Sequence, residues 1–146
     1  MKKWMGIVCL SLLLCFWTGL LVARAQDQGG VLNVLEALDK ERMTDPNQAF
    51  KITTLLTGPA VTLNLAQVNK VVKNHYPQDH DEVVYVVRGN GLVTIAGKEY
   101  RVSPGWTYLV PRGTIHRFVN LGPDATVVLS IFSPAFDGKD RIFVEE

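Results

Sequence analysis

From residue 50 onward, the chain consists of short runs rich in β-branched and aromatic residues, separated by glycine and proline turn signals. Runs this short are typical of strands rather than helices, and β-branched and aromatic side chains favour the pleated backbone. Regularly spaced Gly and Pro turn residues are typical of antiparallel sandwiches and barrels, in which tight turns join consecutive strands. The sequence therefore predicts an all-β antiparallel domain. Its expected strands are Phe50–Leu56, Ala60–Val68, Lys70–Asn74, Glu82–Arg88, Gly91–Ala96, Glu99–Val102, Thr107–Val110, Ile115–Asn120 and Thr126–Phe132.

The segment before these runs has helical periodicity. Val31, Val34, Leu35 and Leu38 are spaced at i, i+3, i+4 and i+7, which places them on one face of a helix. The pattern predicts a short amphipathic helix over residues 31–43, ending before Asp45-Pro46. We expect a helical lead-in over residues 26–48 and one β domain over residues 49–146.

The N-terminal segment has the order of a secretory signal peptide. Two lysines precede an almost wholly apolar stretch, which is followed by the small-x-small site Ala23-Arg24-Ala25. We expect a signal peptide over residues 1–25, cleavage after Ala25, and a periplasmic or secreted product. The apolar length of residues 4–23 leaves one alternative open, an uncleaved membrane anchor.

Charge and cysteine content limit the function of the exported part. Residues 26–146 hold 12 Lys+Arg against 14 Asp+Glu, a net charge of −2, and contain no basic run. Such a surface lacks the basic patch that binds nucleic acid, so no nucleic-acid partner is expected. Contact with a membrane is expected only through the signal segment. Both cysteines, Cys9 and Cys15, precede the cleavage site, so the exported part has neither a disulfide nor a thiol nucleophile.

The chain contains three histidines, His75, His80 and His116, and acidic residues surround the second. Imidazole is the commonest nitrogen ligand for transition metals, and carboxylates complete such sites. Glu82 opens an apolar run, so its carboxylate lies either at the wet end of a sheet or beside a positive group. The residues Asp79-His80-Asp81 alone also fit a solvated turn. For His80 alone this structural interpretation is favoured, whereas His75, Glu82 and His116 together favour a functional role.

Two motifs in this region resemble those of the cupins, a family of small β-barrels. The second cupin motif is glycine, five residues, proline, one, glycine, two, histidine, three, asparagine. Gly105, Pro111, Gly113, His116 and Asn120 match every fixed position. In the first motif, His75, Glu82 and Gly89 match, whereas Asn69 replaces the first glycine and Pro77 replaces the second histidine.

The resemblance implies a cupin-type antiparallel β-barrel, also called a double-stranded β-helix or jelly roll. It also implies that His75, Glu82 and His116 bind a divalent transition metal, with His80 as the candidate to replace the ligand missing at Pro77. Fe, Mn, Ni, Zn and Cu all remain open as the metal. By strand alternation, we expect Val84, Val86 and Phe118 to line a substrate pocket on the ligand-bearing faces.

Two functions fit this resemblance. The first is a metal-dependent enzyme for a small polar metabolite, with dioxygenase, decarboxylase, isomerase or lyase chemistry unresolved. The alternative is a non-catalytic module that binds or senses a small molecule or a metal. By analogy with many cupins, a homodimer is a further expectation, and the outward parity of Tyr85 suits packing between sheets or subunits.

Overall fold

The computed structural model describes residues 30–136 and 138–145, so the predicted signal peptide lies outside the described residues. Within these ranges, no helix is both long and apolar enough to cross a bilayer. One short helix precedes ten strands. The elements are α1 (Val34–Lys40), β1 (Phe50–Thr57), β2 (Thr62–Val68), β3 (Val71–Pro77), β4 (Asp81–Arg88), β5 (Gly91–Ile95), β6 (Lys98–Val102), β7 (Thr107–Val110), β8 (His116–Asn120), β9 (Thr126–Ser133) and β10 (Arg141–Phe143).

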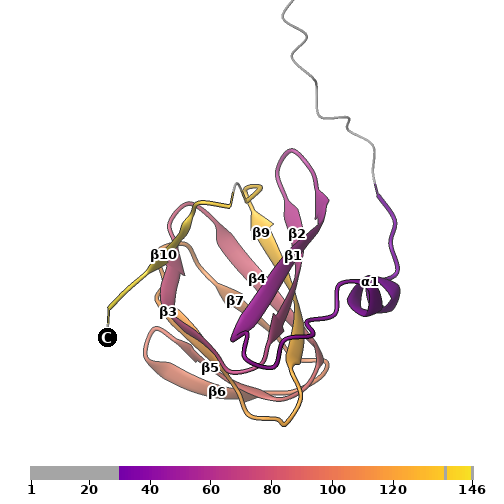
Figure 1. Cartoon of the computed structure of the whole chain (residues 1–146). Helices are drawn as coiled ribbons and strands as arrows, with labels where there is room; N and C mark the ends of the chain where they lie inside the picture. Colours follow the sequence, from indigo (N-terminus) through magenta and orange to yellow (C-terminus); the bar gives the residue numbers. More distant parts are fainter. Residues whose placement is uncertain (1–29, 137, 146) are drawn as a thin grey trace, which may run out of the picture.

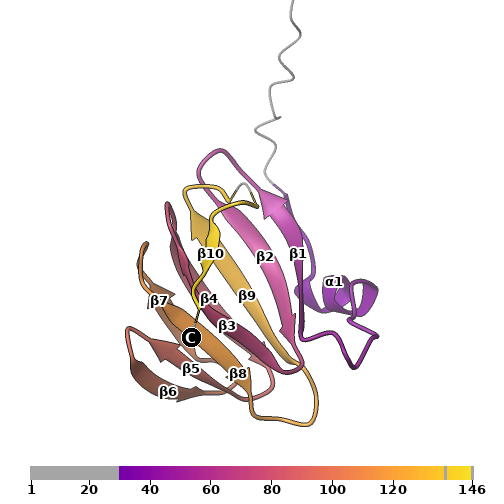
Figure 2. The same ribbon diagram turned by 60° about the vertical axis from the view of Figure 1, so that its left-hand side comes forward.

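The strands form two five-stranded antiparallel sheets that face one another (Figures 1 and 2). The first sheet has the order β1-β2-β9-β4-β7 and the second the order β10-β3-β8-β5-β6. Each sheet pairs strands that are distant in sequence, such as β4 with β9 and β3 with β8, besides one hairpin each, β1–β2 and β5–β6. The predicted all-β barrel is confirmed. Some consecutive strands, such as β3 and β4, lie in opposite sheets.

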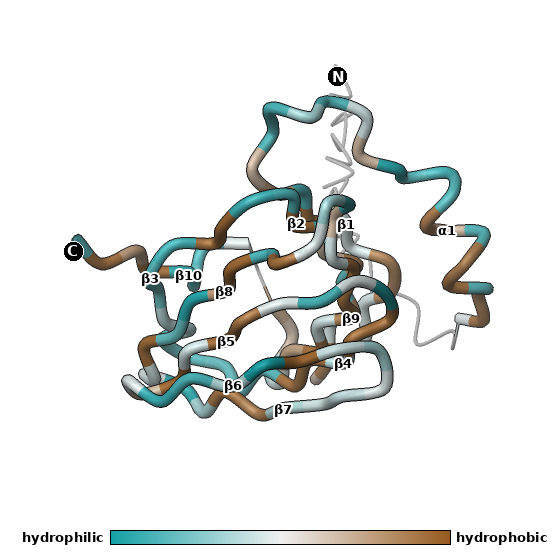
Figure 3. Tube along the Cα trace, turned by 90° about the horizontal axis from the view of Figure 1, so that it is seen from below, coloured by the Kyte–Doolittle hydropathy of each residue, from teal (hydrophilic) through white to brown (hydrophobic). Residues whose placement is uncertain are grey.

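The core lies between the two sheets because the strands alternate inward and outward side chains. In β4, Glu82, Val84 and Val86 are buried, whereas Val83 and Tyr85 are exposed. Hydrophobic and hydrophilic stretches alternate along most of the trace in Figure 3, as this pattern requires. The central cluster comprises Ala66, Val68, Val72, Val84, Val86, Val93, Val102, Phe118 and Val128.

The helix is shorter than the predicted span of residues 31–43. It begins after Asn33, whose side-chain oxygen accepts hydrogen bonds from the backbone N–H groups of Leu35 and Glu36, and it ends at Lys40. Leu38 packs with Leu65 and the β9 residue Val127 on the outer face of the first sheet. The predicted apolar face is only partly buried, since Leu35 remains 63% exposed.

The motif residues fix the turns that carry the strands. Gly89, Gly105 and Gly113 all have positive φ, as expected of glycines in tight turns. Gly89 also has no room for a side chain, because a Cβ there would lie 2.7 Å from the Cα of Thr126. The side chain of Asn120 donates to three backbone carbonyls, including that of Gly122 at 3.1 Å, and accepts from two donors. It therefore fixes the turn after β8, the strand that carries His116.

The C-terminal segment contains a strand that the sequence pattern did not predict. The last expected strand ends at Phe132, and the following residues have a loop-like composition. Instead, β10 adds to the edge of β3, with Arg141 opposite Pro77 and Phe143 opposite His75. Phe136, in the loop before β10, stacks on Phe132 with ring centroids 4.8 Å apart. The segment thus becomes part of the barrel wall next to the candidate site.

Candidate metal centre

Three of the four predicted ligands meet inside the barrel. His75 on β3 lies opposite His116 on β8 in the second sheet, and their ring centroids are 4.0 Å apart. Glu82 comes from β4 in the first sheet, and its Oε2 lies 3.3 Å from Nε2 of His116. One potential ligand atom from each residue lies within 4.8 Å of the other two, and all three side chains are buried. Closure of the barrel therefore brings together residues 41 positions apart in the sequence.

Backbone carbonyls determine which ring nitrogen of each histidine faces the His75–Glu82–His116 group. Nδ1 of His75 lies 2.7 Å from the carbonyl oxygen of Lys73, and Nδ1 of His116 lies 3.3 Å from that of Thr114. A carbonyl only accepts, so each ring donates its Nδ1 proton, which directs Nε2 towards the other two residues. Nε2 of His116 lies beside Oε2 of Glu82 and donates to it when the ring is protonated. When that proton is released, a cation between the two atoms takes its place.

The electrostatic surroundings favour deprotonated ligands. Burial, together with the nearby His116, lowers the pKa of His75 to about 4, so its ring is neutral at pH 7. Burial on its own raises the pKa of the Glu82 carboxyl, but hydrogen bonds from His116 and Ser130 outweigh burial and keep that pKa below its usual value. The hydroxyl of Ser130 donates to Oε1 of Glu82 through a short hydrogen bond. The group therefore holds a carboxylate and an uncharged imidazole, the forms that bind metal.

This donor set fits a divalent transition metal. Two imidazoles and one carboxylate on one side of an ion leave further coordination positions open for a ligand. The carbonyls of Lys73 and Thr114 and the hydroxyl of Ser130 orient the three donors, as hydrogen-bond partners do in known metal sites. The donor types do not distinguish among Fe, Mn, Ni, Zn and Cu.

A small cavity of about 50 Å³ opens beside the three residues. Val84 and Phe118, two of the expected pocket residues, line it, whereas Val86 packs deeper in the hydrophobic core. The cavity therefore combines an apolar wall with one polar end. Its other lining residues are Ile52, Ala66, Val68, Val72, Tyr108, Val128, Ser130 and Arg141.

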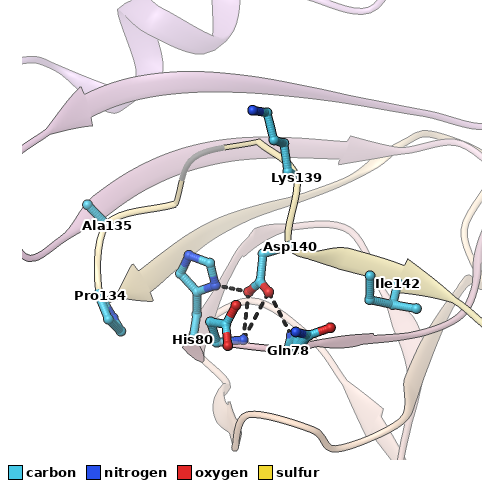
Figure 4. A pocket seen from close by; sticks show the side chains of 8 residues that line it. Gln78, His80, Pro134, Ala135, Lys139, Asp140 and Ile142 are labelled. Carbon is cyan, nitrogen blue, oxygen red and sulfur yellow. Dashed lines mark hydrogen bonds and ion pairs between the residues drawn. The ribbon is translucent and has the colours of Figure 1, made fainter.

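The structure does not bring His80 to the other three residues. His80 precedes β4, is 4% exposed, and donates through Nδ1 to the carboxylate of Asp140. Figure 4 shows this pair beside a separate cavity of about 330 Å³. Oδ1 of Asp140 also accepts the backbone N–H groups of Gln78 at 3.0 Å and Asp79 at 2.9 Å. His80 therefore joins the turn before β4 to the start of β10.

Sequence reasoning missed three polar residues at the centre. Ser130 shares its strand face with Val128 and Phe132, so strand alternation alone could have placed it inside. Tyr108 lies in a predicted strand, but the sequence alone does not separate a place at the cavity from ordinary core packing. Arg141 follows a loop-like segment, and no local signal places it inside the barrel.

The fold and the three converging side chains define a double-stranded β-helix protein with a candidate two-histidine, one-glutamate centre. The sequence profile of the Cupin domain matches residues 65–132. An uncharacterized protein of Aquifex aeolicus (strain VF5) is 30% identical over 111 residues, which cover 76% of this chain and 90% of the relative. The chain belongs to the cupin superfamily.

Solved structures agree with this assignment. KdgF from a Halomonas species has a TM-score of 0.61 and 28% identity, over 68% of this chain and 91% of that one. A conserved double-stranded β-helix protein from Klebsiella pneumoniae has a TM-score of 0.67 over 82% of this chain and all of its own, with 15% identity. The second likeness supports the fold alone.

Proposed function

We propose that this protein is an exported metal-binding cupin whose His75, Glu82 and His116 hold a divalent transition metal inside the barrel. The site then binds or transforms a small polar metabolite in the adjoining cavity. Export rests on the signal-like order of residues 1–25, and the N-terminal sequence of the mature chain tests it. His80 is left out of the proposed ligand set because Asp140 occupies its Nδ1.

One observation carries the proposal. Potential ligand atoms of His75, Glu82 and His116 lie within 4.8 Å of one another, and all three side chains are buried. In a purely structural role, a protonated His116 would donate from Nε2 to Oε2 of Glu82 at 3.3 Å and form a buried ion pair, which leaves His75 without a role. A bound divalent cation satisfies both atoms at once and, when present, supplies Lewis-acid chemistry to a ligand.

The enzyme and the binding module differ in whether the bound metabolite reacts in the cavity. Turnover of a small metabolite that depends on the metal would favour the enzyme. Ligand-dependent thermal stabilisation without turnover across a broad metabolite panel would favour the binding module. Both versions require the metal, so the metal is tested first.

The test is elemental analysis of the protein purified without a polyhistidine tag. We expect close to one transition-metal ion per wild-type chain and a loss of most of it in His75→Ala, Glu82→Gln and His116→Ala. Single ligand losses in such sites weaken binding by tenfold or more, on the order of 1–3 kcal/mol. A wild-type chain that neither retains metal nor binds it on titration would contradict the proposal.

The matched control is His80→Gln, which removes a buried imidazole outside the proposed ligand set. We expect it to retain the wild-type metal content. Far- and near-ultraviolet circular dichroism of every variant separates metal loss from unfolding. Equal metal loss in a folded His80→Gln would return His80 to the ligand set.

A further inference from the structure

Arg141 brings a positive charge to the wall of the cavity beside the three proposed ligands. It is the first residue of β10 and lies opposite Pro77 of β3, two residues from His75. Its side chain lines both the main cavity and a smaller one next to it that also contacts His75 and Glu82. The guanidinium therefore reaches the polar end of the site.

Among the described residues, this guanidinium has no anionic partner of its own. Within residues 30–136 and 138–145, no carboxylate lies within ion-pair distance of it, and the oxygens of Glu82 already engage His116 and Ser130. Burial lowers the pKa of Arg141, which reflects lost hydration, but arginine stays charged at neutral pH. A partly buried charge without a partner is costly, and an anionic ligand would offset that cost.

Arg141 is also held in place before any ligand arrives. Its guanidinium carbon lies 5.9 Å from the centroid of the Phe136 ring, within cation–π range, and Phe136 in turn stacks on Phe132. Backbone pairing of β10 with β3 fixes its Cα. A guanidinium held in this way loses little conformational freedom when it binds a planar carboxylate through two parallel hydrogen bonds.

Tyr108 supplies a second donor on the cavity wall. Burial raises the pKa of its hydroxyl, and the negative charge of Glu82 raises it further, so the phenol remains protonated. No described residue forms a hydrogen bond with that hydroxyl, and it remains available to a ligand oxygen. Apart from Ser130, which donates to Glu82, the remaining wall is apolar, with Val72, Val84 and Phe118 among its residues.

We propose that the ligand of this site is a small organic acid whose carboxylate is bound by Arg141, with the Tyr108 hydroxyl as a second donor. The rest of the acid faces the His75–Glu82–His116 group. The cavity of about 50 Å³ suits an acid of few heavy atoms. With a divalent ion in place, the ion, Glu82 and Arg141 together carry net positive charge, which favours an anion. The orientation of the acid rests on the proposed function, whereas the Arg141–carboxylate contact does not.

The test compares acids with their uncharged amides by isothermal titration calorimetry. The probes are glycolate, pyruvate and malonate, each paired with its amide, together with inorganic phosphate. We expect at least one acid to bind the wild-type chain about tenfold or more tighter than its amide, because charge-assisted hydrogen bonds are the stronger ones. We expect Arg141→Met to weaken that acid by about 10- to 100-fold and to leave its amide unchanged.

Arg101→Met, at an exposed position of β6, is the matched control and should bind as the wild type does. Arg141→Lys keeps the positive charge but lacks the paired donors of a guanidinium. We therefore expect its affinity for the acid to lie between those of the wild type and Arg141→Met. It also tests the proposal if Arg141→Met fails to fold. No binding of any acid by the wild type, no preference over the amides, or a folded Arg141→Met that binds as the wild type does would overturn the inference. Tighter binding of phosphate than of every acid would overturn the carboxylate assignment.

The titrations are run on both the metal-loaded and the chelator-treated protein, which separates this inference from the proposed function. Acid binding that depends on Arg141 in a chain unable to hold metal would remove the proposed function and leave the inference standing. A chain that binds metal but binds each amide as tightly as its acid would remove the inference and leave the proposed function standing.

Discussion

The two histidines of the centre show how single residues acquire a defined chemical form. Each ring faces a backbone carbonyl two residues earlier in the chain, at Lys73 for His75 and at Thr114 for His116. Lys73 lies within β3 and Thr114 in the connection before β8, so the backbone next to each histidine supplies the acceptor for its Nδ1 proton. Glu82 is oriented in a similar way by the hydroxyl of Ser130.

At this scale we predict that the metal-free protein loses stability as the pH falls from about 6.5 towards 4. The folded pKa of His75 is about 4, whereas its ordinary value is 6.5. Between these values, the unfolded chain binds a proton that the folded chain does not, so protonation favours unfolding. Urea unfolding of the chelator-treated protein should show a loss on the order of 1–2 kcal/mol between pH 7 and pH 5 from this residue.

The comparison variant for this measurement is His75→Gln, which cannot be protonated. Its unfolding free energy should change less over the same pH range. Carboxylates contribute mainly below this window, since the pKa of Glu82 is lowered from an ordinary value of 4.5. If the unfolding free energies of the wild type and His75→Gln changed equally with pH, the pKa of His75 would not be lowered in the folded protein.

At the scale of the elements, β10 depends on one buried carboxylate. Asp140 is 7% exposed and accepts hydrogen bonds from His80 and from the backbone of Gln78 and Asp79. Beyond it, the N–H of Val144 donates to the carbonyl of Asn74 at 3.0 Å. Because Arg141 is the next residue after Asp140, the same contacts also position the proposed carboxylate binder.

We predict that Asp140→Ala lowers the free energy of unfolding by about 2–4 kcal/mol, since it leaves His80 and the N–H of Asp79 without their acceptor, whereas the N–H of Gln78 keeps the backbone carbonyl of residue 140. Amide hydrogen exchange at Val144 should accelerate as β10 separates from β3. Asp79→Ala is the control, because the Asp79 side chain is exposed while its backbone contact to Asp140 is kept. Unchanged exchange at Val144 in Asp140→Ala would show that β10 is held by its strand pairing alone.

The strands also show which parts of the molecule could be predicted. Thr107–Val110 matches its predicted span, because alternation and turn glycines are local signals. For β10, three residues pair with a strand some 65 positions earlier, and a local pattern does not record that pairing. The same reason explains His80. Its acidic neighbours in sequence suggested a metal ligand, whereas its partner in space is Asp140, 60 residues away.

At the scale of the whole molecule, the outer face of the first sheet is only half covered. Helix α1 covers the end that contains Leu65 and Val127. Towards the other end, Val83 pairs with Leu109 and Tyr85 with Thr107, which places three exposed apolar side chains together. Their exposed fractions are 39% for Val83, 44% for Tyr85 and 54% for Leu109. This patch contains no charged residue, and β7 is an edge strand of the sheet.

A second copy of the chain would cover both the patch and the open edge, since an edge strand next to an uncharged apolar face favours self-association. We therefore predict a homodimer through the β4–β7 face, measured by sedimentation velocity of the tag-free protein. Tyr85→Lys and Leu109→Lys each place a charge in that interface and should shift the protein to monomer. Tyr100→Lys is the matched control, since Tyr100 is 46% exposed on β6 of the other sheet and should leave the dimer intact. A wild-type chain that sediments as a monomer at every concentration, or a Leu109→Lys variant that remains dimeric, would show that this face is not where two copies meet.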